Sequence, residues 1–258
     1  MRIAELARQR IIVALDVATQ SEAMALVKQL SGHVGLFKVG LELITSEGIG
    51  IVRKITDRGA KVFLDGKFHD IPNTVEGASG AATRLGVAMF NVHTMGGVAM
   101  MQAAAKAAVE EAIKEGIERP LVLGVTILTS IDRFTMNEQL KVAGAVKTQV
   151  VNLAELADMS GLDGVIASPR EITAIRKSVN PKMLIVTPGV RPKWAATQDQ
   201  KRIMTPAEAI DKGASYLVIG RPITKPPIQI GTPINAAKMI SEEIASALIK
   251  RINNLSKV

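Results

Sequence analysis

The sequence predicts an α/β protein folded as a (β/α)8 barrel, the TIM barrel. Short apolar segments typical of buried parallel strands alternate eight times with segments of helical periodicity. The 258 residues match the roughly 250 that such a barrel usually contains. We therefore expect a single domain over residues 1–258, although length alone would also allow two domains. An open doubly wound sheet is the alternative, but no Gly-x-Gly-x-x-Gly sequence follows the first strand.

The elements can be assigned in order along the chain. The expected strands are residues 11–16, 34–40, 61–65, 87–93, 120–127, 163–167, 183–187 and 215–219. Four helix start signals fall between them: Thr19 with Glu22, Ser168-Pro169 with Glu171, Thr205-Pro206 with Glu208, and Thr232-Pro233. Residues 1–10 are expected to form a short helix outside the barrel. Residues 188–204 form a long connection of the kind that often serves as a lid.

Composition excludes several classes of protein. The net charge is +8, yet the basic residues are scattered and aromatic residues are only 3%, which disfavours nucleic-acid binding. The absence of cysteine excludes disulfides and thiolate chemistry and fits a cytoplasmic location. The apolar run 11–15 is too short for a signal peptide, and the run 121–128 is far below the ~20 residues of a membrane span. We expect no membrane partner.

Polar residues gather at the ends of the expected strands, where barrel enzymes build their active sites. They are Asp16, Lys38 within the second strand, Asp65 with Lys67, Asn91 with His93, Thr129 with Ser130, Arg191 after Pro188 and Gly189, and Arg221 after Gly220. Asp65 and Lys67 are two residues apart, so a continuing strand would place both on one face. Such a concentration of opposite charges is costly unless each charge has a partner or a task.

Each of these residues also has a structural interpretation. Lys38 and Asp65 can form a buried ion pair, and Asp16 can be a cap or turn residue. Asp70 can cap a helix that begins near Pro72, and His93 can be a hydrogen-bonded core residue. Gly220-Arg221 can be a simple turn before Pro222, although the loops after strands seven and eight commonly bind phosphate in these barrels.

Several motifs together resemble those of the bacterial orotidine 5'-phosphate decarboxylase family. The most specific is the segment from Asp65 to Thr74, Asp-Gly-Lys-Phe-His-Asp-Ile-Pro-Asn-Thr, together with Asp199-Gln200-Lys201-Arg202. Further matches are Ala14-Leu15-Asp16, Phe37-Lys38-Val39-Gly40, Asn91-Val92-His93, Leu128-Thr129-Ser130, Thr187 to Pro192, Met204-Thr205-Pro206 and Val218 to Pro222. The resemblance extends over nearly the whole chain.

The resemblance implies cofactor-free decarboxylation of orotidine 5'-monophosphate (OMP) to uridine 5'-monophosphate (UMP), the last step of pyrimidine nucleotide synthesis. It implies that Lys38, Asp65, Lys67 and Asp70 form a charged catalytic array, with Lys67 protonating C6. Asp16 and Lys38 would contact the ribose, and Thr129 and Ser130 the pyrimidine. The residues that would bind phosphate are Pro188, Arg191, Gln200, Gly220 and Arg221. In the family, Asp70 and Thr74 enter the site of a neighbouring subunit, which implies a homodimer.

Two alternative functions stay open at this point. Magnesium-dependent sugar-phosphate lyases on the same barrel share the Asp-x-Lys-x-x-Asp pattern but carry a Glu in strand two. Lys38 stands there in this chain, and an ammonium in a ligand position repels Mg²⁺. We therefore expect no metal. The other alternative is a phosphate-ligand or nucleic-acid binding protein without catalytic activity.

Overall fold

The computed structural model describes residues 2–195 and 204–255. Its eight strands follow one another in chain order in a closed parallel barrel, which confirms the predicted fold class. The strands are β1 (Ile11–Ala14), β2 (Leu36–Gly40), β3 (Val62–Phe68), β4 (Met89–His93), β5 (Leu121–Val125), β6 (Gly164–Ile166), β7 (Leu184–Pro188) and β8 (Tyr216–Ile219).

Helices connect the strands. They are α1 (Ile3–Gln9), α2 (Gln20–Leu30), α3 (Leu41–Glu47), α4 (Gly50–Thr56), α5 (Pro72–Arg84), α6 (Gly97–Glu115), α7 (Val146–Met159), α8 (Ile172–Ser178), α9 (Pro206–Asp211), α10 (Arg221–Thr224) and α11 (Pro233–Leu255). Shorter helical turns cover Thr94–Gly96, Thr135–Gln139 and Lys193–Ala195. Within the described residues, none of the helices combines the length and hydrophobicity that crossing a bilayer requires.

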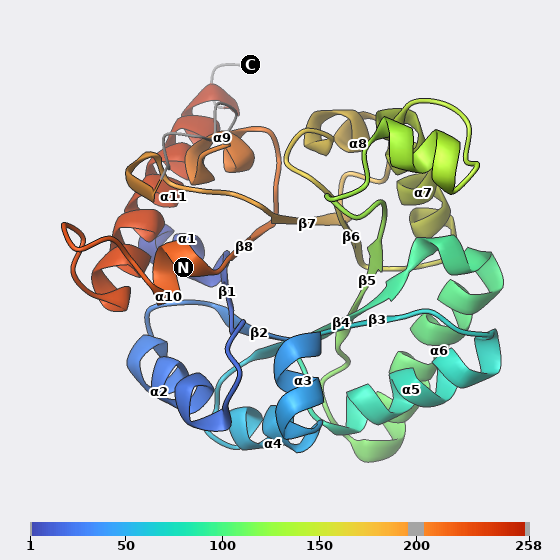
Figure 1. Ribbon diagram of the computed structural model, residues 1–258, viewed down its shortest axis with the longest axis horizontal. Coiled ribbons are helices and arrows are strands. Elements are labelled where there is room, and N and C mark those ends of the chain that lie inside the picture. The colour runs from blue at the N-terminus through green and yellow to red at the C-terminus, as the bar shows by residue number, and fades with distance from the viewer. Residues whose placement is uncertain (1, 196–203, 256–258) are drawn as a thin grey trace. The chain divides into compact units, whose positions relative to one another are not determined.

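The chain divides into two compact units, and both boundaries fall inside strands, β3 and β7. The first unit contains residues 1–65 and 187–258. In it β1 pairs with β2 and β8, and β2 pairs with the first part of β3. The strand residues Ile11, Ile12 and Val13 are fully buried, as expected for a parallel sheet covered by helices. Helices α1 and α11, from opposite ends of the chain, lie side by side in this unit (Figure 1).

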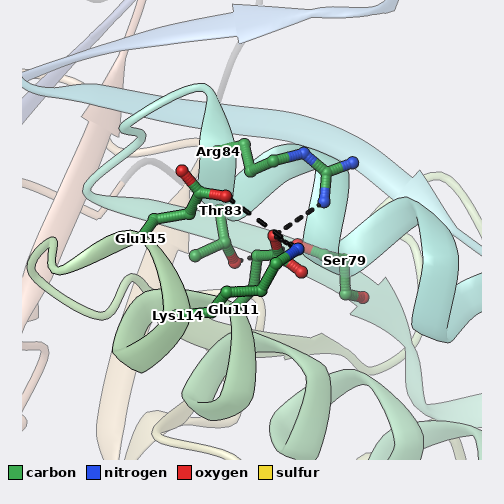
Figure 2. A network of polar contacts seen from close by, with 6 residues as sticks. All are labelled: Ser79, Thr83, Arg84, Glu111, Lys114 and Glu115. Atoms are coloured by element: carbon green, nitrogen blue, oxygen red, sulfur yellow. Dashed lines mark hydrogen bonds and ion pairs between the residues drawn. The ribbon is translucent and has the colours of Figure 1, made fainter.

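The second unit contains residues 66–186, where β4, β5, β6 and β7 pair in order. Helices α5 and α6 pack against each other here (Figure 1). A polar network joins them, which Figure 2 shows. The Glu111 carboxylate of α6 contacts the Arg84 guanidinium of α5 at 2.9 Å and the Lys114 ammonium at 3.0 Å. The two hydrogen bonds lower the pKa of Glu111, that from Lys114 more than that from Arg84.

Three of the four predicted helix starts were confirmed, and one was wrong. The capping boxes at Thr19 and Thr205 are present with both reciprocal hydrogen bonds, and α11 begins at Pro233 as predicted. The prediction for Ser168 was wrong, because α8 begins at Ile172 and Glu171 is its N-cap residue. The Ser168 hydroxyl instead accepts a hydrogen bond from the Arg170 N–H at 3.3 Å, a local turn that competes with helix formation.

Candidate active site

An ion triad lies in the first unit, with Lys38 within β2, Asp65 within β3 and Asp16 two residues after the end of β1. The Lys38 ammonium lies 2.9 Å from the Asp16 carboxylate and 3.3 Å from that of Asp65. The side chains of Lys38 and Asp65 are only 11% and 12% exposed, whereas that of Asp16 is 59% exposed. The ion pair considered from the sequence therefore exists, and Asp16 extends it toward solvent. Two carboxylates share one cation, so the triad carries an excess negative charge.

The register of the strands explains how Lys38 reaches both carboxylates. Gly40 of β2 is paired with Asp65 of β3, two residues beyond Lys38. A Cβ atom added at Gly40 would come within 2.8 Å of the Lys38 ammonium. Because residues two apart in a strand share a face, the missing side chain leaves the space that the ammonium fills. The sequence analysis did not identify Gly40 as part of the site.

The residues expected to bind phosphate belong to the same unit. Gly189 follows β7 with a φ of +76°, and the Arg191 N–H donates to the Met204 carbonyl at 3.0 Å. Gly220 is the N-cap residue of α10, so Gly220-Arg221 begins a short helix rather than forming a simple turn. A Cβ atom at Gly220 would lie 3.8 Å from an Asp16 carboxylate oxygen, which places the start of α10 beside the ion triad. Gln200 lies outside the described residues, as do all of residues 196–203 of the predicted 188–204 loop.

Strand β3 continues past Asp65 into the second unit, three residues further than predicted. Lys67 therefore lies within the strand, but its φ is +50°, a left-handed value that costs a non-glycine residue about 1–2 kcal/mol. The alternation expected of a regular strand consequently does not apply at Lys67. The Lys67 N–H donates to the side-chain oxygen of Asn91 in β4 at 2.7 Å. Asn91 is fully buried; the sequence analysis listed it among the strand-end residues but gave it no specific role.

Asp70 and Thr74 lie at the start of α5. The Asp70 carboxylate accepts a hydrogen bond from the Ile71 N–H at 2.6 Å, whereas the N-cap residue of α5 is Ile71. The interpretation of Asp70 as a helix cap was therefore wrong, because its carboxylate contacts the residue before the helix. Asp70 and Thr74 are both exposed. Because the Asp70 carboxylate is exposed and does not cap the helix, it can contact a ligand or another chain.

Two further pairs of residues, Thr129 with Ser130 and His93 with His69, lie at or just beyond the ends of strands in the second unit. Thr129 and Ser130 form an exposed turn beyond the end of β5. His93 ends β4 half-buried, and its ring centroid lies 5.3 Å from that of His69. The His93 ring is therefore at the end of a strand and in contact with the segment that follows β3.

Comparison with known proteins agrees with the family resemblance found in the sequence motifs. Residues 9–232 match the model of the family described as "Orotidine 5'-phosphate decarboxylase / HUMPS family". The chain belongs to this family. It is 52% identical to an orotidine 5'-phosphate decarboxylase of Moorella thermoacetica over 92% of this chain and 93% of that protein. It is also 52% identical to the Syntrophotalea carbinolica protein of the same name, over 94% and 97% of the two chains.

A solved structure supports the same relationship. The orotidine 5'-phosphate decarboxylase of Lactobacillus acidophilus matches with a TM-score of 0.80 and 35% identity, over 91% of this chain and 98% of that one. The resemblance first identified from short motifs is thus confirmed for the family as a whole. In this family member, the ion triad and the segment from Lys67 to Thr74 are the candidate catalytic elements.

Proposed function

We propose that this protein decarboxylates OMP to UMP without a cofactor, the final step of pyrimidine nucleotide synthesis. The observation that carries the proposal is the Lys38 ammonium between Asp16 and Asp65, in strands whose ends form the active sites of barrel enzymes. Lys67 follows Asp65 by two residues in the same strand, β3. The relatives named as orotidine 5'-phosphate decarboxylases match this chain along nearly its full length.

The chemistry requires stabilisation of negative charge at C6 of the pyrimidine. Loss of CO2 leaves an electron pair on C6, which has no adjacent electron sink, so the protein must supply the electrostatic stabilisation. Lys67 stabilises this carbanion and then donates its proton to C6. Asp65 lies beside the departing carboxylate, and the repulsion between them is relieved as neutral CO2 forms. Lys38 fixes Asp65, and the partner subunit's Asp70 completes the alternating charges.

Remaining contacts bind the rest of the nucleotide. Asp16 and Lys38 contact the ribose hydroxyls, and Thr129 and Ser130 contact the pyrimidine. The phosphate is bound by Pro188, Arg191, Gln200, Gly220 and Arg221. The guanidinium groups provide paired donors suited to phosphate oxygens, and binding of this remote group supplies energy for the reaction at the ring. We also propose that the 188–204 segment closes over the phosphate. A single domain over residues 1–258 is part of the same proposal.

Lys38 also favours this function over a magnesium-dependent lyase. Its ammonium contacts the carboxylates of Asp16 and Asp65, and it repels a divalent cation from the position where the lyases carry a Glu. Among the described residues, no three His, Cys, Asp or Glu side chains are grouped so as to bind a metal ion. The sugar-phosphate lyase chemistry is therefore the less favoured alternative.

The test of the proposed function is an assay of the purified protein with OMP after dialysis against EDTA. Loss of the orotate-type absorbance with release of CO2 is expected without added metal. Activity that appears only after Mg²⁺ is added, on a sugar phosphate rather than OMP, would identify the lyase. Tight binding of OMP or DNA without release of CO2 would identify a binding protein.

We also propose a homodimer in which Asp70 and Thr74 serve the partner's site. Large apolar side chains are exposed in the segments that follow β3, β4 and β5: Ile71, Met95, Leu128, Phe134 and Leu140. Exposed apolar residues gathered in neighbouring loops are typical of protein interfaces. Ile71 adjoins Asp70 directly and is 66% exposed, so contact there would bring Asp70 to the boundary between subunits. The cytoplasmic location expected from the sequence stays a prediction.

Mixing inactive variants tests the shared site. Asp70→Ala and Lys67→Ala are each expected to be inactive alone. In a mixed two-fold dimer one site collects both substitutions and the other collects neither. Random exchange makes about half the dimers mixed, so an equal mixture should recover roughly a quarter of wild-type activity. No recovery after verified subunit exchange would place Asp70 in the site of its own chain.

A further inference from the structure

Asn91 is a fully buried polar residue in an apolar strand. It lies in β4 between Phe90 and Val92, which are fully buried as well. Its side-chain oxygen accepts a hydrogen bond of 2.7 Å from the N–H of Lys67. A buried amide is costly unless it is hydrogen-bonded, so a smaller apolar residue would be the simpler choice for packing alone. The partner of Asn91 is the backbone of the residue to which we assign proton donation.

The backbone of Lys67 has a conformation that needs support. Its φ of +50° is rare for a residue with a side chain, and Lys141 is the other such residue in the described part of the chain. Gly66 precedes it, and a Cβ atom there would come within 2.7 Å of the Phe68 ring. That ring packs against Phe90, the neighbour of Asn91, with 5.8 Å between centroids. Residues of β4 thus contact the chain at Lys67 and at Phe68.

We infer that Asn91 is a positioning residue that holds Lys67 in its left-handed conformation and so sets the direction of its ammonium group. The inference rests on the proposed function of Lys67. The direction of a Cα–Cβ bond follows the backbone angles, so a return of Lys67 to an ordinary strand conformation would redirect the whole side chain. The hydrogen bond to Asn91 stabilises the left-handed conformation against that return. Asn91 acts through Lys67 and needs no contact with the substrate.

Two variants separate the hydrogen bond from the packing. Asn91→Leu keeps a similar volume but has no acceptor, whereas Asn91→Asp keeps the acceptor oxygen. We expect Asn91→Leu to lower kcat for OMP about a hundredfold, since small misplacements of a catalytic group have effects of that size. The KM and the Kd for UMP should change less than about threefold, because other residues bind the ribose and phosphate. Asn91→Asp should retain kcat within about tenfold of the wild type.

Thr126→Val is the matched control. Thr126 is also buried after a strand of the same unit, and its hydroxyl donates to the Ile166 carbonyl at 2.9 Å. The control removes a buried hydrogen bond to the backbone without contacting Lys67, so kcat should stay near the wild-type value. A crystal structure of Asn91→Leu supplies a readout independent of activity, and it should show Lys67 with a negative φ.

The outcomes are distinguishable. A wild-type protein that does not release CO2 from OMP would refute the proposed function, while the crystal structure would still test the conformational role of Asn91. An active wild type with unchanged kcat in Asn91→Leu would overturn the inference. So would a Lys67 φ that stays positive in that variant, or an equal loss of kcat in Asn91→Asp. Failure of both variants to fold would show that Asn91 serves folding, and would overturn a positioning role.

Discussion

Two ion clusters in this protein are built around central groups of opposite charge. In the first unit, the Lys38 ammonium lies between two carboxylates, Asp16 and Asp65. In the second unit, the Glu111 carboxylate lies between two cations, Arg84 and Lys114 (Figure 2). The contact distances in the two triads are similar, from 2.9 to 3.3 Å in the first and 2.9 to 3.0 Å in the second. Distance alone therefore does not separate a catalytic cluster from a structural one.

The burial of the flanking groups and the supporting elements do separate them. The Glu111 side chain is only 15% exposed, but both of its cations are largely exposed, at 46% and 68%, and the cluster joins two helices. Exposed ion pairs of this kind contribute little to stability because water screens them. Lys38 and Asp65 are nearly buried within β2 and β3, where the cost of desolvating charges is high. Charges kept in such a place point to function.

The largest loss of activity should appear when Lys67, two residues after Asp65 of the Lys38 triad, is changed. Lys67→Ala removes both the stabilising charge and the proton donor, so kcat should fall about 10⁴-fold or more. The midpoint of thermal unfolding should change little. Lys61→Ala is the matched control, because Lys61 is an exposed lysine just before β3. Turnover of Lys67→Ala near that of the control would show that another group protonates C6.

A smaller effect is expected when the space beside Lys38 is filled. Gly40→Ala adds a Cβ atom 2.8 Å from the ammonium, which must then shift relative to Asp16 and Asp65. We expect kcat/KM for OMP to fall about tenfold. The free energy of unfolding should fall by less than about 2 kcal/mol, since the crowded atom ends a flexible chain. Gly50→Ala is the control, because a Cβ atom there meets nothing within 4 Å. Equal kinetics of the two variants would contradict a packing role for Gly40.

The smallest effect is expected in the helix network. Glu111→Gln should lower the unfolding midpoint slightly at neutral pH and leave kcat/KM unchanged. Hydrogen bonds from Lys114 and then Arg84 lower the pKa of Glu111, so its stabilising contribution is complete above the ordinary carboxyl value of 4.5. That contribution disappears as the pH falls through the lowered pKa. The difference between wild type and variant should therefore shrink below pH 4.5.

Unfolding midpoints measured across pH check the prediction for Glu111. Glu110→Gln on the same helix is the control, because Glu110 and its partner Lys106 are both mostly exposed and 3.8 Å apart. A difference between wild type and Glu111→Gln that grows as the pH falls would have the wrong sign.

The sequence predicted the barrel and all eight strands because buried parallel strands and helix start signals are local patterns. It also placed Asp16, Lys38 and Asp65 at strand ends, where the structure brings them together. It did not predict the left-handed Lys67, because that conformation depends on a partner in another strand. The space at Gly40 likewise follows from the register of β2 against β3. Ser168 failed as a helix start because the same residue type also favours turns.

The central claim is that the triad around Lys38 is catalytic and the triad around Glu111 is structural. The most direct test measures kcat/KM for OMP and the unfolding midpoint for Lys38→Met beside Glu111→Gln. Lys38→Met should lower kcat/KM about 10²–10³-fold, well beyond its effect on stability, while Glu111→Gln should retain wild-type kcat/KM. Wild-type kcat/KM in Lys38→Met, or activity lost in proportion to stability in both variants, would contradict the claim.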